Sequence, residues 1–323
     1  MDVSIIVVNY NSAALAADCV ASVRARVRGA SYEIIAVDNA SRPEDLAALR
    51  AVGGIDILVE NGANLGFGAA NNRGVARSRG EFLFFLNPDC LLLNDAVSEF
   101  LAFFASPEGA EAGAAGCFLV DGDGAPNHYR GSFAGHEPRR FLANEARQAL
   151  KPLRRLWRRR GGRGSRAEAP RPSGQLDETR AVDWLNGAAL FMPRRAFLEA
   201  GGFDERIFLF SEEVDLQRRL AALGYGRFAV AGPRVAHLHE KGRRMSAATR
   251  THFYRGYLRY VAKHHGPLAF HATRLGLLAV FSFSALAHLF TREYRMVDDI
   301  SLLSAVARFR GSTRHEPAPR RPS

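Results

Sequence analysis

The chain is 323 residues long and 47% hydrophobic, so it can bury one sizeable core or two modest ones, which excludes a disordered protein. Its formal net charge of +11 favours an anionic partner, such as nucleic acid, an acidic membrane surface or a phosphorylated substrate. The three cysteines are scattered without a CxxC spacing, which indicates neither a disulfide framework nor a zinc site and favours a reducing cytoplasm.

Strand-like and helix-like patterns alternate along the first hundred residues. Residues 3–8 are rich in Val and Ile, as in a buried strand, and apolar side chains then recur at helical spacing over 15–27. Strands follow at 33–37 and 55–59, with a short helix between them that Ser41 can cap. Such repeated units predict a parallel, doubly wound α/β sheet. The N-terminal apolar run follows no basic region, so we expect no signal peptide.

A central strand runs into the tripeptide Asn87-Pro88-Asp89. The apolar stretch 82–86 is too short for a helix and rich in Phe, and Pro88 stiffens the turn that follows it. This turn would hold Asn87 and Asp89 at the carboxyl edge of the sheet, where open α/β sheets bind their ligands. Oxygen ligands there suit Mg²⁺ or Mn²⁺, the usual bridge to a diphosphate. Taken alone, the tripeptide is better explained by a polar turn without a ligand.

Other polar residues and glycines follow the remaining predicted strands. Asn9, Asp38 and Gly66 all come after strands, so the fold would collect them with Asp89 on one edge of the sheet. A carboxylate at Asp38 can accept hydrogen bonds from a base or ribose, while Gly66 and Gly68 allow close backbone approach to a phosphate or sugar. Helix capping and tight turns explain the same residues without a ligand, and the glycines lack the full GxGxxG spacing of a dinucleotide site.

Four motifs together resemble the family 2 glycosyltransferases of GT-A fold, and most of all the bacterial rhamnosyltransferase-type members. They are Val-Val-Asn-Tyr-Asn at 7–11, Val-Asp-Asn-Ala-Ser at 37–41, Asn-Leu-Gly-Phe-Gly at 64–68 and Leu-Asn-Pro-Asp at 86–89. The resemblance covers roughly residues 2–245. It implies a Rossmann-like, mostly parallel sheet flanked by helices, a nucleoside-diphosphate sugar donor and a divalent metal, Mg²⁺ or Mn²⁺.

The resemblance also implies roles for individual residues around the donor. Asp38 would contact the nucleotide base, and Asp89 would coordinate the metal on the donor diphosphate. Asn87 stands where many relatives have an Asp, and it can still accept a hydrogen bond from the ribose or a water. Asn9, Gly66 and Asn72 are expected beside the donor as well. The departure at Asn87 leaves open a non-catalytic nucleotide or carbohydrate binder that kept the fold.

The stretch 139–171 is strongly basic, with twelve Arg or Lys residues against two acids. We expect a mobile insertion near 139–180, with a short helix near 141–157. It is either a solvated insertion or a patch that meets anionic lipid or a lipid-diphosphate acceptor. Nucleic acid is not the expected partner, because no aromatic interleaving or recognition module accompanies the arginines.

A second chemical motif lies in the acidic segment after the apolar passage 182–194. Ser211 can cap a helix whose first turn carries Glu212 and Glu213, where a carboxylate can serve as a base or mark an ordinary helix start. The run Glu-Glu-Val-Asp-Leu resembles the family's Glu-Asp-x-Asp-Leu motif, whose second acid takes the proton from the acceptor hydroxyl. That position is Glu213, with one methylene more than the usual Asp. Asp215 is expected to complete the catalytic motif by anchoring it through hydrogen bonds.

A short strand at 227–231 precedes two histidines. The resemblance implies that His237 completes the metal site, with His239 as the alternative, although two alternating histidines also suit an ordinary strand. Lys241 could neutralise the departing nucleoside diphosphate.

Helices are expected from residue 249 onward. The apolar run 275–290 is shorter than the roughly 20 residues that span a bilayer, so it either lies in the interface of an anionic leaflet or packs on the core. The tail after 310 is rich in Pro and Arg and is expected to be disordered. The expected organisation is a nucleotide-sugar half at 1–105, an acceptor and catalytic half at 106–245 and a helical C-terminal region at 246–323.

These expectations combine into one function. The chain would be an inverting, metal-dependent and cytoplasmic glycosyltransferase that is either free or peripheral on the inner face of the plasma membrane. It would move one sugar, with rhamnose from dTDP-rhamnose as the best choice, to a glycan or lipid-linked glycan. Processive relatives carry a Gln-x-x-Arg-Trp motif, which this chain lacks.

Overall fold

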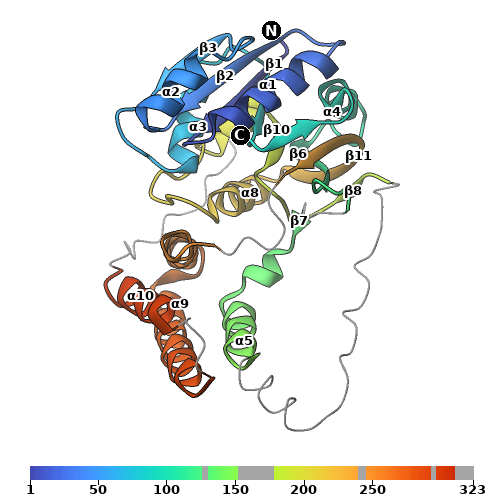
Figure 1. Cartoon of the computed structure of the whole chain (residues 1–323). Coiled ribbons are helices and arrows are strands. Elements are labelled where there is room, and N and C mark those ends of the chain that lie inside the picture. Colours follow the sequence, from blue (N-terminus) through green and yellow to red (C-terminus); the bar gives the residue numbers. More distant parts are fainter. Residues whose placement is uncertain (126–129, 152–177, 239–244, 292–295, 310–323) are drawn as a thin grey trace.

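The computed structural model describes residues 1–125, 130–151, 178–238, 245–291 and 296–309 (Figure 1). Among these residues one nine-stranded sheet has the order β3-β2-β1-β4-β10-β6-β11-β5, with β8 pairing to β11. This single sheet runs through both the expected donor half and the expected acceptor half. Its strands are β1 (Val3–Asn9), β2 (Tyr32–Asp38), β3 (Ile57–Glu60), β4 (Phe82–Leu86), β5 (Cys90–Leu92), β6 (Ala112–Val120), β8 (Arg180–Ala181), β10 (Ala189–Pro193) and β11 (Gly226–His237).

The first four strands in the sheet order are parallel, as the repeated β-α units predict. The second half is mixed, because β10 enters between β4 and β6 and is antiparallel to both, while β11 is parallel to β6. A separate two-stranded sheet joins β7 (Arg130–Gly131) to β9 (Trp184–Leu185). The polar ends of β1, β2 and β4 therefore share one edge, beside the return strand β10.

Helices cover both faces of the sheet (Figure 1). One layer contains α1 (Ala13–Arg26), α2 (Pro43–Arg50) and α4 (Ala96–Phe104), and the other contains α3 (Phe67–Val75), α7 (Arg194–Glu199) and α8 (Glu212–Ala222). Both faces of the central strand are buried, since Phe84 packs into the first layer and Phe85 into the second. Burying one such ring contributes about 1.5–3 kcal/mol, which explains the continuous apolar pattern of β4.

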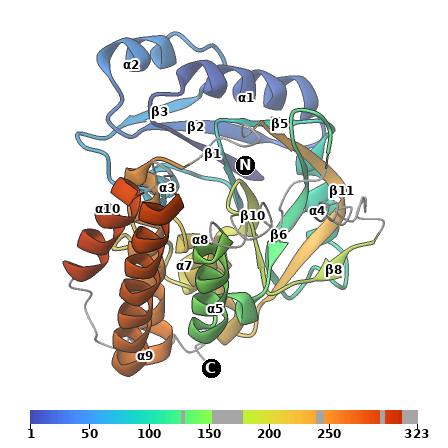
Figure 2. The ribbon, with the colours of Figure 1, turned by 60° about the horizontal axis from the view of Figure 1, so that its bottom comes forward.

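A helical lobe stands beside α8 (Figure 2). It consists of the short 3₁₀ helix η1 (Phe133–His136), α5 (Pro138–Ala149), α9 (Ala247–Thr291) and α10 (Met296–Ala307). These helices share a third apolar cluster that includes Phe141, Tyr257 and Phe281. The long helix α9 is kinked at Gly266, which has a φ of 79° and precedes Pro267. The helical C-terminal region predicted from the sequence is therefore present.

Several local expectations need correction. Ser41 does not cap α2; its hydroxyl accepts hydrogen bonds from Asn9 Nδ2 and Asn11 N instead. The third strand begins at Ile57, two residues later than expected. The apolar run at 275–290 is not a separate short helix but part of α9, which continues on both sides of it. The expected helix in the basic stretch is α5; residues 152–177 lie outside the described part of the chain.

Candidate active site

The turn after β4 is held between two neighbouring strands. Asn87 N donates to the carbonyl of Ala188, which lies just before β10, at 2.9 Å. Leu238 N donates to the Asp89 carbonyl at 2.8 Å, and the antiparallel pairing of β5 with β11 sets His237 opposite Cys90. As a result His237 Nε2 lies 3.3 Å from Asp89 Oδ1. The structure thus brings together the two residues that the family resemblance implies as metal ligands.

The chemistry of this turn fits a divalent cation. One ligand atom each from Asp89, Cys90 and His237 lie within 4.8 Å of one another. Burial and the nearby Asp89 charge raise the pKa of the Cys90 thiol well above its usual value, and the thiol donates to the Ala188 carbonyl, so the chain itself uses this group. Asn87 Oδ1 is buried and has no hydrogen-bond partner among the described residues, which costs about 1–3 kcal/mol. A carboxylate and an imidazole remain, a donor pair that suits Mn²⁺ better than Mg²⁺.

Asn9 organises the ends of β1 and β2. Its side-chain amide donates to Asp38 Oδ1 at 3.0 Å and to Asp45 Oδ2 at 2.8 Å. The other Asp38 oxygen accepts from Ser41 N at 3.0 Å, and the Asp38 residue is only 1% exposed. Ala40, two residues on, has a φ of 62°, a conformation that costs a non-glycine residue about 1–3 kcal/mol. In this structure Asp38 shapes the turn; its contact with a nucleotide base stays a prediction.

Asn39 is a positioning residue that the sequence reasoning missed. Its amide nitrogen donates to Asn64 Oδ1 at 2.9 Å, and its amide oxygen accepts from Leu65 N at 3.0 Å. The residue is 3% exposed, and it fixes the loop that leads to Gly66. Asn39 lies inside the Val-Asp-Asn-Ala-Ser motif at 37–41, which is the sequence signal that could have identified it. From the sequence, only Asp38 and Ser41 of that motif are assigned roles.

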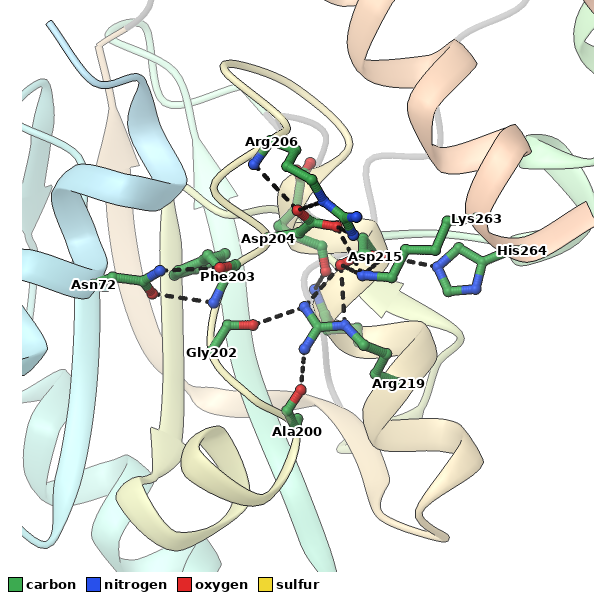
Figure 3. A network of polar contacts seen from close by, with 12 residues as sticks. Asn72, Ala200, Gly202, Phe203, Asp204, Arg206, Asp215, Arg219, Lys263 and His264 are labelled. Atoms are coloured by element: carbon green, nitrogen blue, oxygen red, sulfur yellow. Dashed lines mark hydrogen bonds and ion pairs between the residues drawn. The ribbon is translucent and has the colours of Figure 1, made fainter. Parts of the chain in front are cut away.

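Gly66 and Asn72 join this loop to the segment before α8. Gly66 has a φ of 86°, and a Cβ there would overlap the carbonyl of Phe208, to which Phe67 N donates at 2.9 Å. Asn72 donates to the Phe203 carbonyl and accepts from the Phe203 amide, at 2.9 and 3.1 Å (Figure 3). The side-chain amide of Asn72 is thus hydrogen-bonded within the chain itself. Contacts of Gly66 and Asn72 with the nucleotide-sugar donor stay predictions.

The N-terminus of α8 carries the predicted base. Phe210 and Ser211 both have left-handed backbones, with φ of 66° and 71°, and Ser211 makes no capping bond although it was expected to. Burial raises the pKa of Glu213 to about 7, against the opposing effect of backbone hydrogen bonds. Burial and the Glu213 charge raise the pKa of Glu212 well above its usual value. Near neutral pH, Glu213 can therefore accept a proton.

Asp215 belongs to a buried ion network (Figure 3). Its carboxylate lies 2.7 Å from Arg219, 2.9 Å from Lys263 and 2.7 Å from His264. Burial raises its pKa, but the His264 hydrogen bond and the charges of Arg219 and Lys263 outweigh burial and bring the pKa to about 2. Arg219 also donates to the carbonyls of Ala200 and Gly202. Asp215 is placed as an anchor for α8, not as a proton acceptor.

The loop at Gly187 and Ala188 lies between Glu213 and the Asn87–Asp89 turn. A Cβ on Gly187 would lie 3.3 Å from Glu213 Cβ, so the loop packs directly on the base. The next residue, Ala188, accepts from Asn87 N at 2.9 Å and from the Cys90 thiol at 3.4 Å. The side chain of Glu213 and the Asn87–Asp89 turn thus border the same two-residue stretch, Gly187 and Ala188. His239 and Lys241 lie outside the described residues.

Comparison with known proteins shows the family to which the chain belongs. A family model described as glycosyl transferase family 2 matches residues 4–158. The N-acetylglucosaminyl-diphospho-decaprenol L-rhamnosyltransferase of Mycobacterium tuberculosis (strain ATCC 25618 / H37Rv) is 30% identical in an alignment of 223 residues that covers 65% of this chain and 68% of that protein. The O-antigen biosynthesis protein RfbC of Myxococcus xanthus is 28% identical over 80% of this chain, which matches only 19% of RfbC.

Solved structures share the fold at low sequence identity. GalNAc-T7 with UDP, GalNAc and Mn²⁺ has a TM-score of 0.55 and 17% identity, over 81% of this chain and 48% of that one, so this chain spans about half of it. The mannosyltransferase PcManGT of Pyrobaculum calidifontis with GDP-Man and Mn²⁺ has a TM-score of 0.52 and 17% identity, over 94% of this chain and 74% of that one. The chain belongs to glycosyl transferase family 2 and is a glycosyltransferase of GT-A fold, as its four motifs indicated.

Proposed function

We propose that the protein transfers one sugar, with inversion, from a nucleoside diphosphate to a hydroxyl of a lipid-linked glycan. The observation that carries this proposal is the contact of Gly187 with Glu213 and of Ala188 with Asn87, which sets the base beside the turn for the donor diphosphate. The choice of dTDP-rhamnose as donor, and of a glycan on a lipid diphosphate as acceptor, is supported by the name of the mycobacterial relative.

Asp89 and His237 would hold the divalent cation, with Asn87 Oδ1 available at the same turn. When bound, such a cation supplies neutralising charge to the diphosphate that leaves. Mn²⁺ is present in both GalNAc-T7 and PcManGT, which supports a divalent metal here.

Glu213 acts on the acceptor. Its carboxylate takes the proton of the acceptor hydroxyl, and the oxygen then attacks the anomeric carbon from the face opposite the leaving diphosphate. A single displacement of this kind inverts the anomeric configuration. With a pKa of about 7, the Glu213 side chain is about half ionised near neutral pH, where a base balances availability against strength.

Transfer of a single residue is favoured over polymerisation. The segment that would carry Gln-x-x-Arg-Trp reads Gln217-Arg-Arg-Leu220 here, without the Trp. Gln217 is buried and pairs with the backbone of Leu185, accepting from its amide at 2.8 Å and donating to its carbonyl at 2.9 Å. Gln217 therefore ties α8 to β9, and this structural role accounts for the residue without any contact to a growing polymer.

Peripheral attachment to an anionic membrane on the cytoplasmic side is part of the proposal. Among the described residues, one helix, within 247–288, is long and apolar enough to cross a bilayer, a property that core helices share. One face of α9 beyond the kink is exposed and apolar, with Leu268, Leu275 and Leu286 exposed by 83%, 67% and 56%. The net charge of +11 complements an acidic leaflet.

The direct test is turnover of nucleotide sugars by the purified protein. With dTDP-rhamnose, a divalent metal and an N-acetylglucosaminyl-diphospho-lipid, we expect rhamnosylated lipid and free dTDP; the common UDP- and GDP-sugars serve as controls for the donor. Binding of a nucleotide sugar without turnover of any of them would instead support the non-catalytic binder.

A further inference from the structure

The start of α8 is strained and must be held from outside the helix. Phe210 and Ser211 adopt left-handed backbones at a cost of about 1–3 kcal/mol each, and the Ser211 side chain makes no capping bond. Such conformations persist only where the surroundings enforce them. Because Glu213 lies two residues after this strained pair, whatever holds the pair also sets the position of the base.

The first half of α9 supplies that support along one helical face. His252 stacks on Phe208 with ring centroids 4.3 Å apart, and Phe253 meets Phe210 edge-on at 5.7 Å. One turn later, a Cβ on Gly256 would overlap the carbonyl of Phe210, so α9 crosses the loop at the closest approach that a helix allows. These contacts cover the segment immediately before α8.

Further along the same face, side chains of α9 form ion pairs with residues on both sides of this segment (Figure 3). Lys263 Nζ lies 2.9 Å from Asp204, which precedes the loop, and 2.9 Å from Asp215, which follows Glu213 by two residues. His264 Nε2 lies 2.7 Å from Asp215. Because Asp215 is ionised, its carboxylate accepts this hydrogen bond and the Nε2 of His264 donates it.

We infer that Lys263 and His264 are positioning residues for the transfer reaction, which act through Asp215 to hold Glu213 at the acceptor hydroxyl. The inference rests on the proposed function, because it takes Glu213 as the base. Donor binding should be independent of the pair, since Asn9, Asp38 and Asp89 lie on the sheet edge and not on α8. Loss of either side chain would let the start of α8 relax, and a displacement of about 1 Å can cost about 10²-fold in rate.

The experiment compares His264→Leu and Lys263→Met with the wild type in kcat, donor KM and unfolding temperature. We expect kcat to fall by about 10- to 100-fold while donor KM stays within about threefold. His264→Gln should restore most of the rate, because its amide nitrogen can occupy the place of Nε2. The matched control is Ser284→Ala, which removes a buried 2.8 Å hydrogen bond to Asp299 elsewhere in α9 and should lower the unfolding temperature without lowering kcat.

Two results would overturn the inference. One is a kcat loss in His264→Leu no larger than that in Ser284→Ala at an equal loss of unfolding temperature, and the other is a His264→Gln variant as slow as His264→Leu. Hydrogen exchange of the amides at 208–216 gives a readout that does not need activity. If the wild type transfers no sugar, the proposed function fails, and faster exchange in His264→Leu would then still support the positioning role while unchanged exchange would refute it.

Discussion

Replacing Glu213 with Gln removes the proton acceptor and keeps the shape of the side chain. We expect the transfer rate at saturating donor to fall by roughly 10²- to 10⁴-fold, the range for loss of a general base, while the donor dissociation constant is unchanged. In the wild type the rate should rise with pH through the Glu213 pKa of about 7, because only the ionised carboxylate accepts a proton. Between pH 6 and pH 8 this titration corresponds to about a tenfold increase.

The same substitution should stabilise the fold above neutral pH. Burial raises the pKa of Glu213 from 4.5 to about 7 in the folded protein. As the pH rises from 4.5 to 7, Glu213 ionises in the unfolded chain but stays mostly protonated in the folded one, so the free energy of unfolding falls over this range. The shift corresponds to at most about 3 kcal/mol, which Glu213→Gln recovers in part at pH 8. If Glu213 is a buried base, Glu213→Gln should both transfer sugar more slowly than the wild type and unfold at a higher temperature at pH 8.

Two variants serve as controls for this assignment. Burial and the Glu213 charge raise the pKa of Glu212 and so disfavour its ionised form, so Glu212→Gln should cost less than Glu213→Gln. Glu213→Asp keeps a base while drawing the carboxylate back by one methylene. The measurements are transfer rate, donor dissociation constant and thermal unfolding at pH 6, 7 and 8. A Glu213→Gln enzyme within a few-fold of the wild type, with Glu212→Gln inactive, would refute the reasoning and move the base to Glu212.

Asp89→Ala should lose donor binding and transfer together, as should chelation of the wild type; full activity in excess EDTA would remove the metal from the mechanism. Cosedimentation with anionic vesicles should be strong at low salt and weaken as salt rises, and Leu275→Glu should reduce it further; equal recovery with neutral vesicles, or none with either, would contradict attachment through α9. Gly66→Ala should destabilise the protein by about 2–4 kcal/mol in thermal unfolding. Two costs add up to this value: the positive φ of 86°, which strains an alanine, and the clash of its Cβ with the Phe208 carbonyl. Gly124 also has a positive φ, of 76°, but open space around it, so an equal loss in Gly124→Ala would show that the clash contributes nothing.

The sheet edge could be predicted from the sequence because its signals are local. A buried strand reads as a short apolar run, and the polar residue that ends it is its neighbour in the chain, so Asn9, Asp38 and Asp89 could be placed on one edge without a structure. The meeting of Asp89 with His237 depends on the antiparallel pairing of β5 with β11, and it was reached only through resemblance to the family.

What the sequence could not show is set by contacts between distant segments. Gly66 was assigned to the donor, yet its immediate constraint is Phe208, far along the chain. Ser41 and Ser211 have the residue type of helix caps, but neither makes the capping bond, because the Ser41 hydroxyl binds the end of β1 and the Ser211 backbone is left-handed. The support of α8 by α9 leaves no local pattern, since Lys263 and His264 lie 48 and 49 residues after Asp215 in the chain.

The most direct measurement of the central claim is the anomeric configuration of the product. The protein would be incubated with dTDP-rhamnose, a divalent metal and the N-acetylglucosaminyl-diphospho-lipid, and the new glycosidic bond would be read by nuclear magnetic resonance. A single displacement with Glu213 as base predicts one new linkage of configuration opposite to the donor, absent from the Glu213→Gln reaction. A product of retained configuration, or transfer undiminished in Glu213→Gln, would contradict the account.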